Sequence, residues 1–216
     1  MKHTKLFAQS VLALFVLLLA APLFGASTSI DDSRTTTYSM GNGEDLTVNG
    51  GIAVTAAVKV ASGVTSGAHT VESSGALTST AGRAVLVEGT LNGDIVNRGT
   101  ITGANDGTGP SIDMAAGTMT GMFLNSDSGV ITGGVTIQGG TGATNLGRIS
   151  ALGWGLDASL SALRGNMLNS GTILSTQAGA LYVGDVSGYL RNSGSLDGAS
   201  GLTIQGSIAG DDTNSG

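Results

Sequence analysis

Residues Leu91 to Gly103 read LNGDIVNRGTITG, a stretch in which single aliphatic residues are separated by glycine, asparagine and other polar residues. Glycine-rich runs of this kind can cradle phosphate groups, or they can mark the corners between short strands of a repeat protein. A phosphate loop needs the pattern G-x-x-x-x-G-K-[ST] or a strand–glycine loop–helix context, and the sequence has neither. The stretch therefore favours the repeat interpretation.

The motif at Asn97–Ile101, in which asparagine and glycine flank one residue and an aliphatic residue follows soon after, recurs along the chain. Further copies stand at 145–149, 169–173 and 192–196, and at 73–77 with serine in place of asparagine. A looser copy stands at 125–131, and another begins at 214–216. Their glycines are separated by 24, 30, 18, 24, 23 and 22 residues, and the odd intervals of 30 and 18 together span two periods of 24. A fixed period of this length indicates a solenoid, because each repeat buries its apolar face only against its neighbours.

Short apolar runs between glycines predict strands rather than helices. A helix needs an apolar period near 3.6 residues, and each interior glycine costs it about 1 kcal/mol. Aligned repeats begin with alternating apolar pairs, such as Val85 with Val87 and Leu181 with Val183. The sequence therefore predicts an all-β solenoid with three short strands per coil of about 22–24 residues, paired in parallel about 4.8 Å apart.

The repeated asparagine and glycine are predicted to form the corners between strands. Both residue types accept left-handed backbone conformations, which corners can require. We expect the asparagine amides to stack in a hydrogen-bonded ladder, and Leu91, Ile95 and Ile101 to point inward on three successive strands. The predicted structural corner ladder comprises Asn97, Gly99, Asn145, Gly147, Asn169, Gly171, Asn192 and Gly194. Unrelated surface turns and an antiparallel meander are the alternatives, although hairpins would not predict a fixed period.

The N-terminus has the order of a secretory signal peptide, residues 1–27, which would form a helix. A short basic segment precedes the apolar run 6–21, and small residues follow at 25–27. A transmembrane anchor is the alternative, but the apolar run is shorter than the roughly 20 residues of a membrane span. We therefore expect export through the inner membrane, to the cell surface or outer membrane or into the medium.

The composition narrows the range of partners. The 216 residues include 37 glycines and no cysteine, with 11% charged and 4% aromatic residues and a formal net charge of -6. Nucleic acid is not expected as a partner, because its binding relies on lysine and arginine. Stability must come from backbone pairing and burial, since disulfides are impossible. Export also argues against a nucleotide cofactor, and we expect no cofactor.

The leader followed by glycine- and asparagine-rich coils resembles the passenger domain of bacterial autotransporters, which use type V secretion. Filamentous-haemagglutinin-like adhesins are similar. The N-x-G-x-[IL] motif carries the resemblance, which spans roughly Leu46 to Gly216 and the leader. It implies a right-handed parallel β-helix displayed outside the cell and normally followed by a translocator barrel. We expect that barrel to be absent from these 216 residues, because the aromatic residues after Gly129 are too few for the girdles of membrane strands.

Three regions are expected: the signal peptide 1–27, an irregular lead-in 28–45, and a β-helix passenger-like domain 46–216 that is truncated at its C-terminus. The resemblance implies a non-enzymatic, secreted or cell-surface scaffold of adhesin type. Its partners would be surface molecules of a host or a neighbouring cell, and a translocator barrel of its own or from a separate chain if the gene is longer. The alternative is a secreted β-helix carbohydrate-active enzyme, a polysaccharide lyase or hydrolase. That function would require Asp94, Asp113, Asp185 and Arg164 to converge.

Few residues could carry chemistry. His69 is the only histidine outside the leader, and in its glycine-, serine- and threonine-rich stretch we expect a solvated or corner residue. The segment 103–113, GANDGTGPSID, lacks the repetition of calcium-binding β-rolls, so a loop that projects from the coil is favoured. Trp154 could contact a sugar, but a packed role is favoured. We therefore predict no catalytic, cofactor-binding or metal-ligating residue.

Overall fold

The computed structural model describes residues 26–49, 53–54, 58–72, 75–79, 82–106 and 109–216, of which 53–54 are described by their backbone alone. The helix of the predicted signal peptide lies outside the described residues. Within them, every regular element is a strand. Among the described residues, no helix has the length and apolar character needed to cross a membrane.

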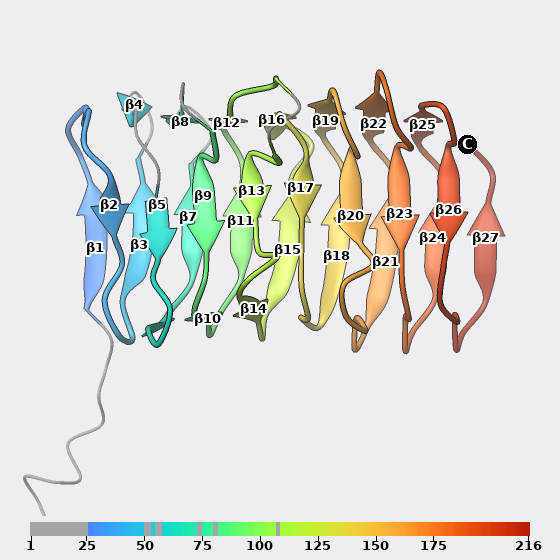
Figure 1. Ribbon diagram of the computed structural model, residues 1–216, viewed down its shortest axis with the longest axis horizontal. Coiled ribbons are helices and arrows are strands. Elements are labelled where there is room, and N and C mark those ends of the chain that lie inside the picture. The colour runs from blue at the N-terminus through green and yellow to red at the C-terminus, as the bar shows by residue number, and fades with distance from the viewer. Residues whose placement is uncertain (1–25, 50–52, 55–57, 73–74, 80–81, 107–108) are drawn as a thin grey trace, which may run out of the picture.

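The strands form three long parallel sheets and one short sheet (Figure 1). Sheet A has nine strands: β1 (Ser27–Ile30), β3 (Asp45–Val48), β7 (His69–Val71), β11 (Ile95–Asn97), β15 (Met122–Asn125), β18 (Gly142–Asn145), β21 (Asn166–Asn169), β24 (Leu190–Asn192) and β27 (Asp212–Asn214). Sheet B has seven: β4 (Ala53–Val54), β8 (Ala76–Thr78), β12 (Thr100–Thr102), β16 (Val130–Thr132), β19 (Arg148–Ala151), β22 (Thr172–Ser175) and β25 (Ser195–Asp197). Sheet C has eight: β2 (Tyr38–Ser39), β5 (Val58–Val60), β9 (Val85–Val87), β13 (Ile112–Asp113), β17 (Val135–Thr136), β20 (Leu156–Ala158), β23 (Leu181–Val183) and β26 (Leu202–Ile204). Sheet D has three: β6 (Thr65–Ser66), β10 (Thr90–Leu91) and β14 (Thr118–Met119).

The first circuit has only β1 of sheet A and β2 of sheet C. From β3 onward the chain passes through the sheets in the order A, B, C and, where it is present, D, and one circuit is one coil. Strands that follow each other in sequence belong to different sheets, whereas strands one coil apart pair in parallel. Figure 1 shows the coils side by side, from β1 at one end to β27 at the other. The fold is an all-β parallel β-solenoid of about seven turns, which confirms the predicted fold class. The right-handed sense stays a prediction.

The segment 28–45, expected to be an irregular lead-in, contains β1 and β2. β1 pairs with β3, and β2 pairs with β5, so parallel pairing begins at Ser27. Ile30 and Met40 of this segment are buried. The polar residues that suggested irregular structure, such as Thr35–Thr37, lie at exposed positions around these few apolar side chains. A coil with so few inward residues gives little periodic signal in sequence.

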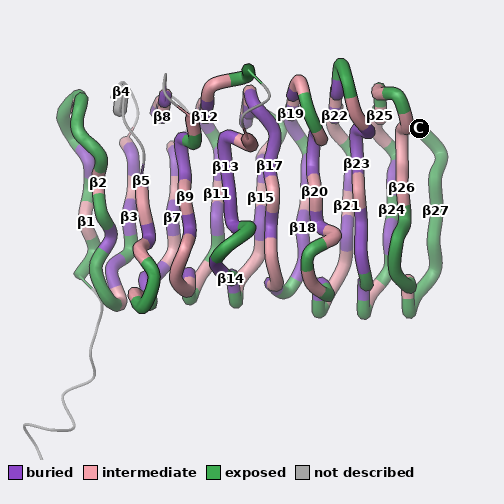
Figure 2. The backbone as a smooth tube through the Cα atoms, in the orientation of Figure 1, coloured by how far each residue is buried: buried purple, intermediate pink, exposed green. Residues whose placement is uncertain are grey.

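Inward side chains stack in aliphatic ladders that form the core. In sheet B, one ladder of fully buried, successively paired residues contains Leu77, Ile101, Ile131, Ile149 and Ile173. In sheet C, another contains Val85, Ile112, Val135, Leu156 and Leu181. Leu91, Ile95 and Ile101 are fully buried on β10, β11 and β12, as predicted. Figure 2 shows buried positions along the strands of nearly every coil, and burying each such side chain contributes about 1.5–3 kcal/mol.

Close approach between coils requires the corner glycines, rather than the left-handed backbone that the sequence suggested. Positive φ angles in the described residues occur only at glycines. The corner glycines are not among them, namely Gly99, Gly147, Gly171 and Gly194. A Cβ on Gly147 would lie 2.2 Å from the carbonyl oxygen of Gly129. That oxygen accepts a 2.9 Å hydrogen bond from the backbone N–H of Arg148, which holds it in place. The space for a side chain is thus occupied by the pairing between coils.

We expect Gly147→Ala to lower the free energy of unfolding by about 3 kcal/mol, because backbone atoms would have to move to relieve the overlap. Gly153→Ala is the matched control, since a Cβ there would meet no heavy atom within 4 Å. The control should stay within about 0.5 kcal/mol of the parent protein. Urea unfolding followed by circular dichroism measures both, and equal midpoints for the two variants would contradict the close-approach explanation.

Candidate functional site

A ladder of asparagine side chains runs inside sheet A. It links Asn97, Asn125, Asn145, Asn169, Asn192 and Asn214. At each step the Nδ2 of one residue donates to the Oδ1 of the next, at 2.7–2.8 Å. The structure thus places all four predicted asparagines in one ladder. The ladder also contains Asn125, from the looser copy of the motif, and Asn214, neither of which was predicted. All but Asn214 are buried.

The asparagine ladder also binds the backbone at the corners. Asn125 Nδ2 lies within hydrogen-bonding distance of the carbonyl oxygens of Gly129 and Arg148, at 3.2 and 3.3 Å. The backbone N–H of Gly99 donates to Asn97 Oδ1 at 3.2 Å. In the first coils the same position holds apolar Ile30, Val48 and Val71. Buried amides with protein partners have no means of contacting a ligand, so this ladder is structural.

His69, expected to be solvated or at a corner, is fully buried in β7. It pairs with Leu46 and Ile95, and the inward ladder continues with Phe123. Neither ring nitrogen has a hydrogen-bond partner. Burial lowers the pKa of His69 to about 4, because the imidazolium would lose its hydration. The alternation of the strand AHTV, which the polar composition of the stretch obscured, directs His69 into the core, where it cannot reach an external substrate.

The residues that an enzyme would need are not brought together. Asp113 lies on β13 of sheet C beside the guanidinium of Arg83. Asp94 precedes β11 in sheet A, and Arg164 precedes β21, three strands away in that sheet. At about 4.8 Å per strand, Asp94 and Arg164 are roughly 14 Å apart. Asp185 lies beyond them, between β23 and β24. No group of three or more histidine, cysteine or acidic residues in the described part of the chain could hold a metal ion.

Several carboxylates cap backbone groups of the next coil. Asp94 Oδ1 accepts from the backbone N–H of Met122 at 2.7 Å, and Asp45 Oδ1 accepts from Ala68 at 2.7 Å. Asp185 Oδ1 accepts from the backbone N–H of Ser207 at 2.8 Å. This bond, together with one from the Ser207 hydroxyl, lowers the pKa of Asp185. These acidic residues therefore connect adjacent coils.

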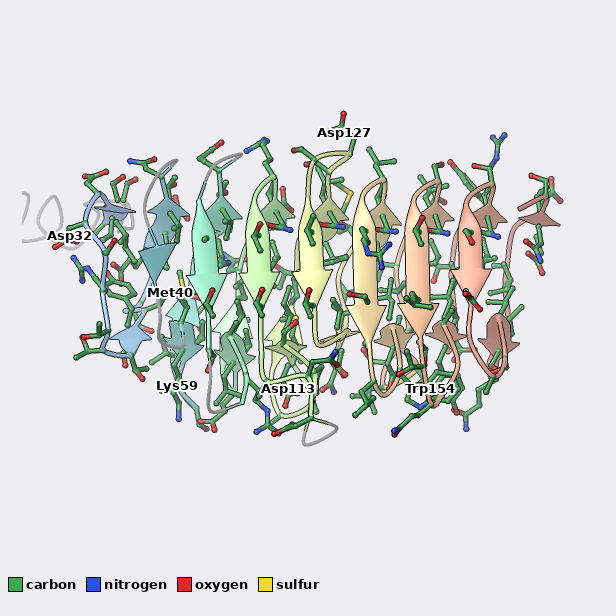
Figure 3. All side chains as sticks on the ribbon, turned by 90° about the horizontal axis from the view of Figure 1, so that it is seen from above. Asp32, Met40, Lys59, Asp113, Asp127 and Trp154 are labelled. Carbon is green, nitrogen blue, oxygen red and sulfur yellow. The ribbon has the colours of Figure 1, made fainter. Side chains whose placement is uncertain are left out.

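A cleft of about 180 Å³ lies beside Trp154 at the outer side of sheet C. It is lined by Asn105 and Pro110, by Thr136 of β17, by Trp154 of the turn before β20 and by Asp157 of β20. Asn105 Oδ1 accepts a 2.8 Å hydrogen bond from the backbone N–H of Leu152, two coils further on. The described residues of segment 103–111 thus fold along the solenoid and wall a cleft. In Figure 3, Asp113 and Trp154 lie on the same side of the molecule, opposite Asp127.

Trp154 is packed and also lines the cleft. Its ring stacks on that of Tyr182, with centroids 4.6 Å apart and planes 23° from parallel. Gly179 leaves space for it, because a Cβ there would lie 2.0 Å from the Trp154 ring. Tyr182 could not be predicted from sequence as its neighbour, because the two residues meet only when consecutive coils stack.

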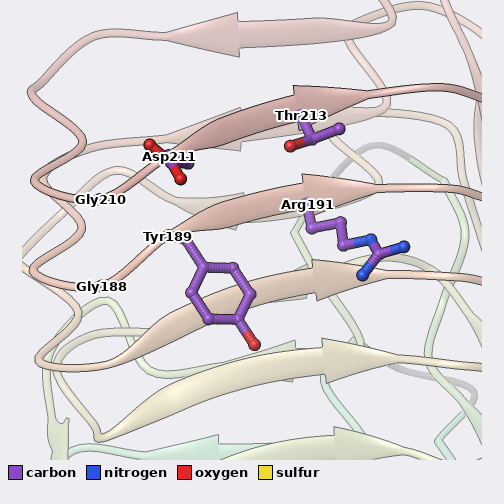
Figure 4. Close-up of a pocket in the computed structure, with 6 residues that line it drawn as sticks. All are labelled: Gly188, Tyr189, Arg191, Gly210, Asp211 and Thr213. Atoms are coloured by element: carbon purple, nitrogen blue, oxygen red, sulfur yellow. The ribbon is translucent and has the colours of Figure 1, made fainter.

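A second hollow, of about 640 Å³, lies over the outer face of β24 and β27 (Figure 4). Its side chains are those of Tyr189, Arg191, Asp211 and Thr213. Tyr189 is 40% exposed, and unlike Trp154 it takes part in no ring stacking with another described aromatic residue. The cleft beside Trp154, with walls from several coils, is therefore the stronger candidate binding site.

Comparisons of the chain with protein-family models, with curated proteins and with solved structures found no match.

Replacing Asn145 by alanine should lower the free energy of unfolding by about 2–4 kcal/mol, because the buried polar atoms of Asn125 and Asn169 would lose a partner. Thr144→Ala is the control, since Thr144 lies on the same strand and is only partly buried. Denaturant midpoints at constant pH measure both changes. A loss below about 0.5 kcal/mol for Asn145→Ala would show that the ladder is not stabilising.

Acid should destabilise the protein through His69. The unfolded imidazole has a pKa of about 6.5 and the folded one a pKa of about 4, so the unfolded state takes up the proton first as the pH falls. The free energy of unfolding should therefore decrease by about 3 kcal/mol between pH 6.5 and pH 4 from this group. His69→Leu, which matches the apolar ladder, should remove this component and raise stability at pH 7. Parallel pH dependence in both proteins, measured by denaturant unfolding, would refute the assignment.

Proposed function

We propose that the chain is a non-enzymatic β-helical scaffold, exported and displayed at the cell surface or released, which presents its outer face to other molecules as an adhesin-like passenger does. The observation that carries the proposal is the use of Asp45, Asp94 and Asp185 as caps between coils. Acidic side chains that hold backbone N–H groups support a long rigid body. They are poorly placed for proton transfer to a substrate.

The division between inner and outer positions supports a binding role. Inner positions are occupied by the aliphatic and asparagine ladders, whereas outer positions have no such packing requirement. A solenoid therefore offers an extended surface on which binding residues can vary without loss of the core. We infer that its partners are surface molecules of a host or a neighbouring cell. Attachment would use a translocator barrel, either its own in a longer gene product or a separate one.

Export is inferred from the leader. Its basic segment, apolar run and small residues at 25–27 have the order that the secretory machinery recognises. The alternative function, a secreted polysaccharide lyase or hydrolase, would need acids and bases on one face. The separation of Asp113 on sheet C from Asp94 near sheet A gives that alternative no support.

The export proposal predicts a processed chain outside the cytoplasm of a Gram-negative host. Fractionation and N-terminal sequencing of the expressed chain should find residues 1–27, or nearly so, removed. The control carries Leu14→Arg and Leu18→Arg, which interrupt the apolar run and should leave an unprocessed cytoplasmic chain. An unprocessed, cytoplasmic parent chain would refute export.

Release of reducing ends or unsaturated uronides from a panel of polysaccharides by the purified protein would refute the non-enzymatic assignment.

A further inference from the structure

We propose that the cleft beside Trp154 binds one neutral pyranose unit of a glycan. The proposal deepens the scaffold function, because it names the chemistry that the displayed surface would recognise. It rests on the proposed function only in assuming that the protein meets the glycan outside the cell. The three features that support it are a supported aromatic ring, a row of polar side chains and a preformed cleft of suitable size.

The aromatic ring supplies an apolar surface. A pyranose has faces made of C–H groups, and these pack favourably against the face of an aromatic ring. Trp154 is held in place by stacking on Tyr182, at 4.6 Å between ring centroids, and its ring lies against Gly179, which has no side chain to displace it. A ring that is fixed before binding loses little conformational entropy when a ligand arrives. Trp154 therefore meets the first requirement of a sugar-binding site.

A row of polar side chains lies beside this ring. Thr136 pairs directly with Asp157, and Asp157 pairs directly with Tyr182, on the outer side of sheet C. The spacing of about 4.8 Å between paired strands is similar to the width of a pyranose ring. Ser159 donates to Asp157 Oδ1 through its backbone N–H at 2.9 Å and its hydroxyl at 2.6 Å, which orients the carboxylate. The Thr136 hydroxyl and the Asp157 carboxylate can then bond to sugar hydroxyls.

The size and charge of the cleft define the ligand. Its volume of about 180 Å³ is below the roughly 300–1,000 Å³ of pockets for drug-sized ligands, so it suits a single ring. None of its lining residues is lysine or arginine, and Asp157 contributes a carboxylate. The nearby Arg83 is paired with Asp113. Acidic sugars would therefore be repelled, and neutral sugars are favoured.

Trp154 is the only tryptophan of the chain, so its fluorescence reports on the cleft directly. We expect a saturable change in emission when the purified protein is titrated with at least one of four probes: methyl α-glucopyranoside, methyl α-mannopyranoside, methyl β-galactopyranoside and N-acetylglucosamine. Galacturonate at equal ionic strength should give none. Thr136→Val, which removes one hydroxyl and keeps the shape, should weaken binding about fivefold. Tyr189→Ala, at the other hollow, is the matched control and should leave the affinity unchanged.

Calorimetry extends the test to Trp154→Ala, for which binding should weaken more than tenfold while circular dichroism stays that of the parent. No saturable response to any neutral probe, a preference for galacturonate, or unchanged affinity in both cleft variants would each overturn the glycan proposal. The scaffold proposal would survive those results, since export is measured independently. Conversely, release of free sugar from a methyl glycoside would overturn the non-enzymatic assignment and leave the binding site in place.

Discussion

The close approach of neighbouring coils at each Asn-x-Gly corner is the constraint on which the rest of the solenoid depends. Strands of consecutive coils must pair along their whole length, and the turn between sheets A and B must let the backbone pass without a side chain between coils. At Gly171 a Cβ would lie 2.1 Å from the carbonyl oxygen of Gly147. That oxygen accepts a 2.9 Å hydrogen bond from the N–H of Thr172. Glycine is needed at this corner because the pairing itself fills the space.

The asparagine two residues earlier solves the complementary problem of buried polar backbone. Where the backbone turns between packed coils, its carbonyl and N–H groups need partners. Asn145 Nδ2 donates to Asn169 and lies 3.3 Å from the carbonyl oxygen of Gly147. The first coils place Val48 and Val71 at the same position, so the fold accepts an apolar side chain there. The later coils thus exchange hydrophobic contact for a continuous amide chain, whose members polarise one another. Such a chain also specifies register, because a slipped coil would leave amides unpaired.

The period of the fold could be predicted from sequence because the corner fixes it. The intervals of 30 and 18 residues show how lengths vary without loss of register. The longer one includes the segment between β12 and β13, which walls the cleft. In the shorter one the chain passes from β17 to β18 with no sheet D strand, and only Gly139 bridges to Met119. Strand pairing restores the register at every corner. The period can therefore be recognised in the sequence even though the spacing between copies is unequal.

The cleft could not be predicted for a related reason. Its residues point outward, and outward positions carry no ladder that would impose a pattern. Trp154 gave a weak signal by itself, whereas Tyr182 and Thr136 had none, because their proximity depends on the strand order β17, β20 and β23. For His69 the prediction of a solvated or corner position was wrong, because the residue is fully buried. Its polar neighbours suggested exposure, but inward direction is set by alternation along β7, and a buried histidine without partners runs against the usual rule for polar groups.

The outer surface therefore depends on the core, whereas the core does not depend on the outer surface. The cleft combines Asn105 and Pro110 with residues of β17, of the turn before β20 and of β20 itself, so it exists only when those coils are stacked in register. Gly134, where a Cβ would lie 2.5 Å from the carbonyl oxygen of Trp154, belongs to the same arrangement. The corner glycines and the asparagine ladder hold that register from within, without contacting the outer face. Substitutions at outer positions can then change what the surface binds while the ladders keep the fold. Substitutions in the ladders would disturb the fold and every site on it together.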